Sequence, residues 1–279
     1  MLLVPVDIKD CLVKQLSVVS KNTNYKTKIG IKNVKKIGRI YDCANSWVQI
    51  GVASLRSKEK SLAHPIFMGE LDHGRKKYTF YPKKCHGAKF ILFCEKDKHN
   101  LMKHYPDHAS KIETTFRMGF TGGIHYLGNE NNPIHIEKIH FDGHEHYHRN
   151  LDKNRIINRI ISLRSYCSIS DRNDLIDDRS SDQNKSNSQD YEDCLLLQLT
   201  DLLIGCSRTI LGEYTREIHK SLSLPLKAIF DRYREGPARM KNSRWENSLC
   251  LSRCYLDVDH WEFESLTYGE KNSLQLSLI

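Results

Sequence analysis

Apolar residues recur at helical spacing in six segments of the chain. Leu12, Leu16 and Val19, for example, fall on one side of a helix with 3.6 residues per turn. The six predicted helices are residues 7–20, a pattern running through Trp47 and Val52, and residues 107–120, 151–166, 195–211 and 215–234.

Individual residues predict where some of these helices begin and end. We expect the carboxylate of Asp107 to cap the third helix. The pair Gly122-Gly123 predicts the end of that helix, because glycine is a poor helix former. Pro225 predicts an interruption in the last helix, since proline removes a backbone donor.

Shorter apolar runs predict strands at residues 64–72, 88–97 and 134–142. In the third run, Ile134 and Ile136 alternate with polar residues. Ile139 and Phe141 then resume the alternation one residue out of phase, which predicts a bulge or break.

Strands that alternate with helices through long connections predict an α/β layered fold. We expect one domain over residues 1–235 and a C-terminal extension, residues 236–279, that packs on it. The stretch "LCLSRCYLDVDHWEFESL" predicts an added strand in that extension. Residues 171–193 are polar and poor in apolar anchors, so they predict a loop. Its segment Asp177 to Asp182 is interpreted as solvated, or as one wall of a cleft next to the following helix.

Charge and length narrow the class of protein. The 279 residues carry 43 Lys and Arg against 34 Asp and Glu, and this excess of positive charge favours a polyanion such as nucleic acid as partner. No run is long and apolar enough to span a membrane, and the start lacks the basic region of a signal peptide. Nine cysteines without a CxxC pair favour a reduced, cytoplasmic protein over a disulfide framework.

The first candidate for chemistry is Asp201, a carboxylate within the apolar run "LLLQLTDLLIG". An unpaired buried carboxylate is costly, so this position calls for a reason. One stripe of the predicted helix carries Cys194, Gln198, Asp201, Gly205 and Arg208. Asp201 is therefore either part of a site or a structural residue paired with Arg208.

The second candidate is Asp142 in "HFDGHEHYHRN", where a predicted strand ends in a glycine turn. A carboxylate at the end of a strand is well placed to hold a metal ion in a cleft. Two such carboxylates sharing Mg²⁺ or Mn²⁺ would form a phosphoryl-transfer site. The alternatives are that His144, His146 and His148 bind zinc, or that one of them contacts phosphate.

The stretch "LLLQLTDLLIGCSRT" resembles the helix motif of a large bacterial family, the domain of unknown function number thirty-eight hundred. "IHIEKIHFDGHEHYHRNLDKNRI" resembles that family's central strand, acidic turn and following helix, and the resemblance spans about residues 1–235. It implies a fold similar to ribonuclease H, with a mixed central sheet flanked by helices and an acidic cleft suited to divalent metals. Carried over, it points to Asp142 and Asp201, with Gln198 beside them.

The chain departs from the family pattern at its start. The family opens with a strand ending in Asp-Glu-Ser-Gly or similar, and a Glu-apolar-Lys motif follows. The first is absent here, and Gly30-Ile31-Lys32 occupies the expected place of the second without its Glu. We therefore expect an N-terminally incomplete version of the fold, a misassigned start, or a protein that has lost activity. Glu70, Asp72 and Glu95 are candidate substitutes for the missing ligand.

The leading hypothesis is a nuclease or phosphoryl-transfer domain that uses Mg²⁺ or Mn²⁺. Asp142 and Asp201 would hold the metal and act in catalysis. The basic residues expected to contact the phosphate backbone are Lys32, Lys35, Lys36 and Arg39. The alternatives are a non-catalytic nucleic-acid-binding module and an interaction protein of a mobile-element or defence system.

Overall fold

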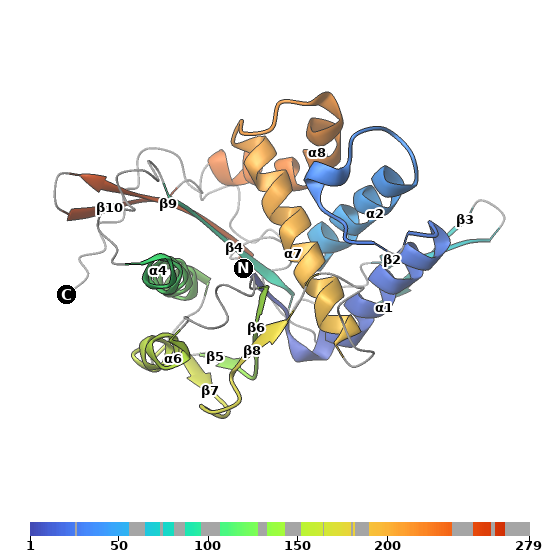
Figure 1. Ribbon diagram of the computed structural model, residues 1–279. Helices are drawn as coiled ribbons and strands as arrows, with labels where there is room; N and C mark the ends of the chain where they lie inside the picture. The colour runs from blue at the N-terminus through green and yellow to red at the C-terminus, as the bar shows by residue number, and fades with distance from the viewer. Residues whose placement is uncertain are drawn as a thin grey trace.

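The protein is described by a computed structural model of mixed α/β architecture (Figure 1). It describes residues 1–25, 27–55, 65–72, 75–80, 87–95, 107–127, 133–142, 152–163, 165–179, 181, 190–235, 248–257 and 260–265. The helices in these ranges are α1 (Val6–Asn22), the short 3₁₀ helix η1 (Ile31–Asn33), α2 (Arg39–Ser54), α4 (His108–Leu127), α6 (Lys153–Ile161), α7 (Tyr191–Ile210) and α8 (Glu217–Arg234).

The main sheet has the strand order β1-β4-β9-β10. Its strands are β1 (Leu2–Leu3), β4 (Lys89–Glu95), β9 (Leu249–Asp257) and β10 (His260–Ser265). β4 and β9 run parallel, whereas β1 pairs with β4, and β10 with β9, in antiparallel fashion. The C-terminal region thus contributes two strands, β9 lying directly beside β4.

Within the described ranges, three two-stranded pairs accompany this sheet. They are β2 (Pro65–Asp72) with β3 (Arg75–Phe80), β5 (Ile134–Ile136) with β7 (Cys167–Ile169), and β6 (Ile139–Asp142) with β8 (Ile176–Arg179). The last two pairs are parallel. The predicted strand 134–142 is therefore two strands, and its phase slip corresponds to the break at Glu137 and Lys138.

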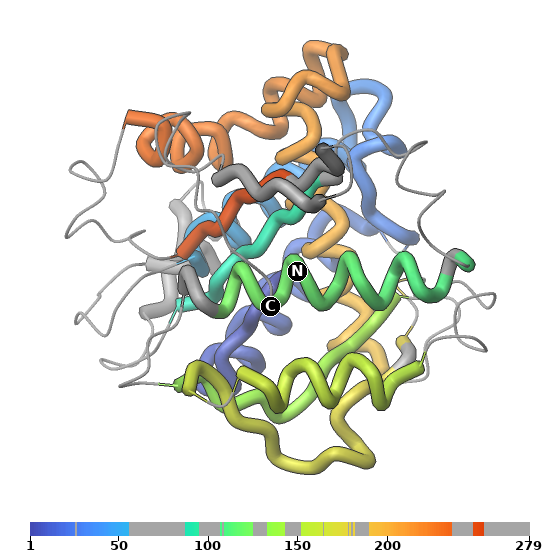
Figure 2. The backbone as a smooth tube through the Cα atoms, turned by 90° about the vertical axis from the view of Figure 1, so that its left-hand side faces the viewer, coloured from blue at the N-terminus to red at the C-terminus, as the bar shows by residue number. Residues whose placement is uncertain are grey.

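Helices cover both faces of β4 because its residues are apolar on both sides. Phe90 and Leu92 belong to the main hydrophobic core, which α1, α2, α7 and α8 also line. Ile91 lies on the opposite face, where α4 packs. Figure 2 shows α4 and α6 side by side in front of α7. The α/β class predicted from the sequence is confirmed.

The glycines of α4 do not end the helix, so that prediction is wrong. α4 continues through Gly122-Gly123 to Leu127. A Cβ on Gly123 would lie 2.3 Å from a side-chain carbon of Ile91, and one on Gly119 would lie 2.8 Å from Phe93. These glycines therefore allow α4 to lie close against β4. Asp107 does cap the helix, accepting a hydrogen bond from the Ser110 amide at 2.7 Å.

Two further predictions need correction. The segment predicted as a solvated loop contains β8, which pairs in register with β6. The acidic residues of this segment lack the apolar pattern that predicts a strand. The segment is a strand because it pairs with β6. α8 is also continuous from Glu217 to Arg234, with Pro225 inside it rather than interrupting it.

The basic segment after α1 lies across α7. Ile31 packs on Gly205, where an added Cβ would lie 2.5 Å from the Ile31 Cγ2 atom. The carbonyl oxygen of Val34 lies 3.0 Å from Nε2 of His219 in α8. The first contact holds the segment that carries Lys28 against α7, the helix that carries Asp201, and the second holds it against α8. Within the described ranges, no helix has the length and apolar character needed to cross a membrane.

Replacing Gly205 with alanine tests this close approach. Because the new methyl group would collide with Ile31, we expect Gly205→Ala to lower the free energy of unfolding by about 1–3 kcal/mol. Gly122→Ala is the matched control: nothing lies within 4 Å of its Cβ position, so alanine there should raise stability by about 0.5–1 kcal/mol. Urea denaturation measures both, and a Gly205→Ala protein as stable as the wild type would contradict the close approach.

Candidate active site

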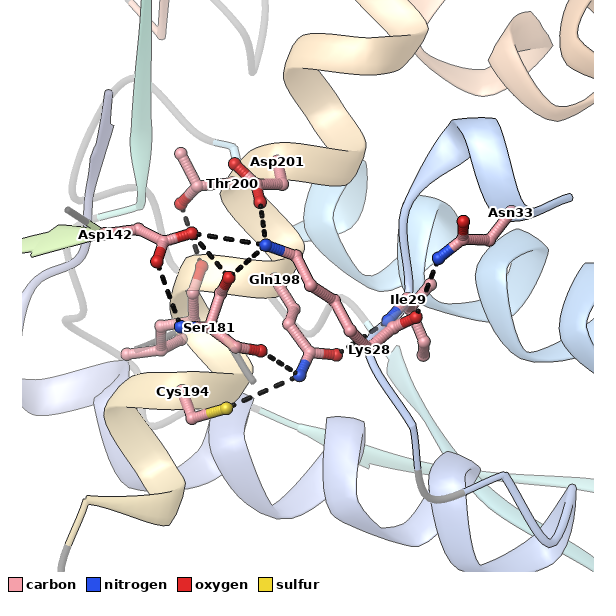
Figure 3. A network of polar contacts seen from close by, with 10 residues as sticks. Lys28, Ile29, Asn33, Asp142, Ser181, Cys194, Gln198, Thr200 and Asp201 are labelled. Atoms are coloured by element: carbon pink, nitrogen blue, oxygen red, sulfur yellow. Dashed lines mark hydrogen bonds and ion pairs between the residues drawn. The ribbon is translucent and has the colours of Figure 1, made fainter. Parts of the chain in front are cut away.

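Gln198 organises the site from the middle of α7. Its side chain is fully buried. The Ile29 amide donates to its Oε1 atom at 3.0 Å, and its own Nε2 atom donates to the Ser181 carbonyl oxygen at 2.7 Å (Figure 3). The side-chain amide of Gln198 thus binds two segments, which are distant from each other in the chain, to α7 about one turn before Asp201.

The hydrogen bond between Ile29 and Gln198 places the neighbouring residue, Lys28, beside Asp201. Its Nζ atom lies 3.4 Å from Oδ2 of Asp201 and 3.4 Å from Oδ2 of Asp142 (Figure 3). The two carboxylate oxygens are therefore no farther apart than twice that distance. The ammonium group also donates to the Ser181 hydroxyl. One cation position is consequently shared by two carboxylates from different elements.

Asp142 is held in place by the end of the neighbouring strand. It is the last residue of β6 and lies opposite Arg179 of β8 in the parallel register. Ser181 follows two residues later, and its amide donates to Asp142 Oδ1 at 3.1 Å while its hydroxyl donates to Oδ2. Asp142 thus lies at the end of a strand, as predicted from the sequence, and the carboxyl ends of two parallel strands meet there.

Asp201 is only partly buried, although leucines surround it in the sequence. Its side chain is 39% exposed, compared with 28% for Asp142 and 42% for Lys28. The alternative that Asp201 pairs with Arg208 is wrong. Arg208 instead binds Glu213, with Nε and Oε2 2.7 Å apart. On the predicted stripe of α7, Asp201 therefore faces a polar site.

The pKa values of the two carboxyl groups are shifted in opposite directions. Burial acts to raise the pKa of Asp142, but the hydrogen bonds from Ser181 and the charge of Lys28 outweigh it, so this pKa lies below its ordinary value. Partial burial raises the pKa of Asp201 above its ordinary value despite the nearby Lys28. Burial also opposes the charge of Lys28, yet both carboxylates together raise its pKa. Asp142 and Lys28 are thus the more firmly charged members.

A second group of polar contacts holds the start of α7 beside the site. Asp193 Oδ1 lies 2.9 Å from Lys9 Nζ of α1 and 3.6 Å from Nε2 of His140. His140 points to the same side of β6 as Asp142, because it precedes Asp142 by two residues. Burial lowers the pKa of His140 even though Asp193 opposes this. These contacts position α7 against β6 and α1.

Sequence reasoning missed Lys28 and Ser181. Lys28 lies in the basic stretch whose expected motif lysine was Lys32, and Ser181 lies in the segment interpreted as a loop. No spacing along the chain connects either residue to the two aspartates. The four residues expected to contact nucleic acid, Lys32, Lys35, Lys36 and Arg39, are all exposed.

The oxygen atoms of Asp142, Asp201 and Ser181 are of the type that Mg²⁺ and Mn²⁺ prefer. The described ranges contain no group of three or more His, Cys, Asp or Glu side chains arranged for a metal ion. Two carboxylates still suffice for Mg²⁺, which completes its shell with water and substrate phosphate. The Lys28 ammonium group is a cation that already lies between these two carboxylates. The residues therefore fit a divalent ion. His144, His146 and His148 lie outside the described residues.

The opposite pKa shifts predict opposite effects on stability. The depressed pKa of Asp142 contributes stability above its ordinary pKa, and this is lost as pH falls through the folded-state value. Asp142→Asn should therefore lower the free energy of unfolding at pH 7 by about 1–3 kcal/mol. The raised pKa of Asp201 acts the other way: stability falls as pH rises through it. Asp201→Asn should leave stability at pH 7 unchanged or raise it.

Urea denaturation of both variants in a chelating buffer measures this difference, and the two asparagine substitutions serve as controls for each other. Equal losses of stability in both would mean that Asp201 is a structural partner of Lys28 in the same sense as Asp142.

No family model matches the chain, and neither the curated proteins nor the solved structures contain a significant match. The family resemblance noted in the sequence thus stays a prediction. The contacts among Lys28, Asp142, Ser181 and Asp201 carry the functional interpretation.

Proposed function

We propose that this chain is a metal-dependent nuclease or phosphoryl-transfer domain that acts on nucleic acid. The observation that carries the proposal is the shared cation position: Asp142 and Asp201 each present an oxygen 3.4 Å from the same Lys28 Nζ atom. Here the two carboxylates come from different elements and meet at the end of a strand. A second carboxylate raises the local negative charge beyond what one lysine neutralises, which favours a divalent ion.

The placement of the carboxylates supports the same interpretation. One lies at the carboxyl end of a parallel strand and the other on a helix that packs against it, with helices on both faces of the mixed main sheet. We propose that this is the ribonuclease H-like arrangement that the sequence resemblance implies. Asp142 and Asp201 would then be the metal ligands of its acidic cleft.

Each residue of the site has a task in this mechanism. Asp142 and Asp201 would hold Mg²⁺ or Mn²⁺. The bound ion would supply Lewis-acid chemistry, making water more acidic and neutralising charge on the phosphate. Ser181 orients Asp142 through its amide and hydroxyl, and Gln198 fixes the main chain on either side. Lys28 offers a positive charge for a phosphate oxygen.

The exposed cations after Lys28 would guide the substrate. Ile31 lies on Gly205, one helical turn beyond Asp201, which corresponds to about 6 Å along α7. The chain then continues through Lys32, Lys35, Lys36 and Arg39, all exposed. A phosphate backbone crossing the two aspartates would meet these residues next.

A second candidate function is nucleic-acid binding without catalysis. The observation in its favour is that Lys28 already neutralises part of the charge on the two aspartates. In that case the basic segment would bind phosphate and the site would remain closed by its own lysine. An interaction protein of a mobile-element or defence system, with structural aspartates, is the third interpretation.

Cleavage of labelled DNA and RNA with Mg²⁺ or Mn²⁺ tests the first proposal. We expect the wild type to cleave one of them and Asp142→Asn and Asp201→Asn each to lose about 100-fold or more, because each removes a metal ligand. Glu192→Gln, an exposed acidic residue of the same helix, is the matched control and should retain full activity. Cleavage by Asp201→Asn at the wild-type rate would refute the enzyme, and binding without cleavage by the wild type would favour the second candidate.

The salt dependence of binding tests the basic segment. Replacing Lys32, Lys35, Lys36 and Arg39 with alanine should weaken binding and reduce the slope of log affinity against log salt by about 0.9 for each phosphate that the variant no longer neutralises. Fluorescence anisotropy of labelled duplex DNA gives both quantities. A variant with alanine at four other exposed cations, Lys14, Lys21, Arg159 and Arg172, controls for total charge. An unchanged slope in the fourfold variant would place the phosphate-binding residues elsewhere.

A further inference from the structure

The peptide bond that follows Lys28 is anchored through both of its polar groups. The next residue, Ile29, donates its amide to Gln198 at 3.0 Å. The Lys28 carbonyl oxygen accepts hydrogen bonds from Asn33 Nδ2 at 3.2 Å and from the Tyr25 hydroxyl at 3.3 Å. The side chain, by contrast, is 42% exposed. The lysine can therefore change the direction of its four-carbon side chain without any change in the backbone.

The ion pairs of Lys28 are shared and long. Both measure 3.4 Å, whereas Lys9 lies 2.9 Å from Asp193 and Lys220 lies 2.6 Å from Glu217. An ammonium group that closes on one carboxylate would give one short and one long distance. The equal distances place Lys28 Nζ between the carboxylates, where an ion bridging them would also lie. The Lys28 ammonium group and a metal ion would repel each other at such short range, so both cannot occupy this position together.

The charges of the site favour an exchange. Two ionised carboxylates and one ammonium leave a net negative charge, which a divalent ion would remove. The displaced ammonium would lie beside the ion, where a phosphate of the substrate brings new negative charge. Without either cation, Asp142 and Asp201 would face each other with like charge.

We propose that Lys28 is a built-in counter-ion that holds Asp142 and Asp201 together until a divalent cation displaces it, and that the displaced ammonium then turns to a substrate phosphate. This inference rests on the proposed function, because it takes the two aspartates as metal ligands. It adds that the protein's own lysine competes with the metal. The metal-free site is thereby held in order and its affinity for the ion is limited.

Titration of the protein with Mn²⁺ by calorimetry tests the competition. Lys28→Met should bind Mn²⁺ about tenfold tighter or more than the wild type, because its competitor is gone. Lys28→Arg keeps the charge and should bind as weakly as the wild type. Asp201→Asn should lose binding, which identifies the site. Without metal, Lys28→Met should unfold at a lower urea concentration than the wild type, and Mn²⁺ should restore the loss.

Acylation of lysines provides a readout that needs no variant. Acetic anhydride followed by mass spectrometry should label Lys28 of the wild type more strongly in saturating Mn²⁺ than without it, with exposed Lys14 as the internal reference. If Asp201→Asn loses Mn²⁺ binding but Lys28→Met binds no tighter and Lys28 labelling does not change, the competition is refuted while the metal site stands. If the wild type and Lys28→Met both fail to bind Mn²⁺, the inference and the metal in the proposed function fail together.

Discussion

The arrangement of the site depends on one constraint: two like-charged carboxylates are held close enough to share a cation. Asp142 lies at the end of a strand, where Ser181 binds its carboxylate, and Asp201 lies in the middle of a helix. The charge on Lys28 offsets their repulsion in the described structure. Any cation that binds there must satisfy both oxygens, so the identity of that cation determines what the site can do.

The fold supports this constraint through contacts that are not themselves charged. Gln198 satisfies the Ile29 amide and the Ser181 carbonyl in the interior, and Gly205 gives Ile31 room to lie on α7. A buried amide that is fully hydrogen-bonded specifies one arrangement, because any other would leave polar groups unpaired. The position of the charges is therefore determined in large part by neutral groups.

Local pattern predicted most of the elements but only half of the site. The helices follow from apolar periodicity, as α1 and α7 illustrate, and the two aspartates stood out because each breaks its local pattern. What failed depends on distant partners. Gly123 looks like a helix end until Ile91 is found against it, and β8 looks like a loop until β6 pairs with it. Lys28 is one lysine among many in a basic stretch, and only the folded chain selects it.

The pKa values of the two aspartates are shifted in opposite directions, and this difference sets Asp201 apart from a simple salt-bridge partner. In a structural pair, each charged group is more stable ionised in the folded protein than in the unfolded chain. Asp142 meets this condition, but Asp201 does not, because partial burial raises its pKa despite Lys28. Leu202 and Leu203, the next residues of α7, are fully buried, so packing fixes the place of this carboxylate on the helix. Under the proposed function, the metal requires the charge of Asp201, and this requirement would explain a carboxylate among leucines.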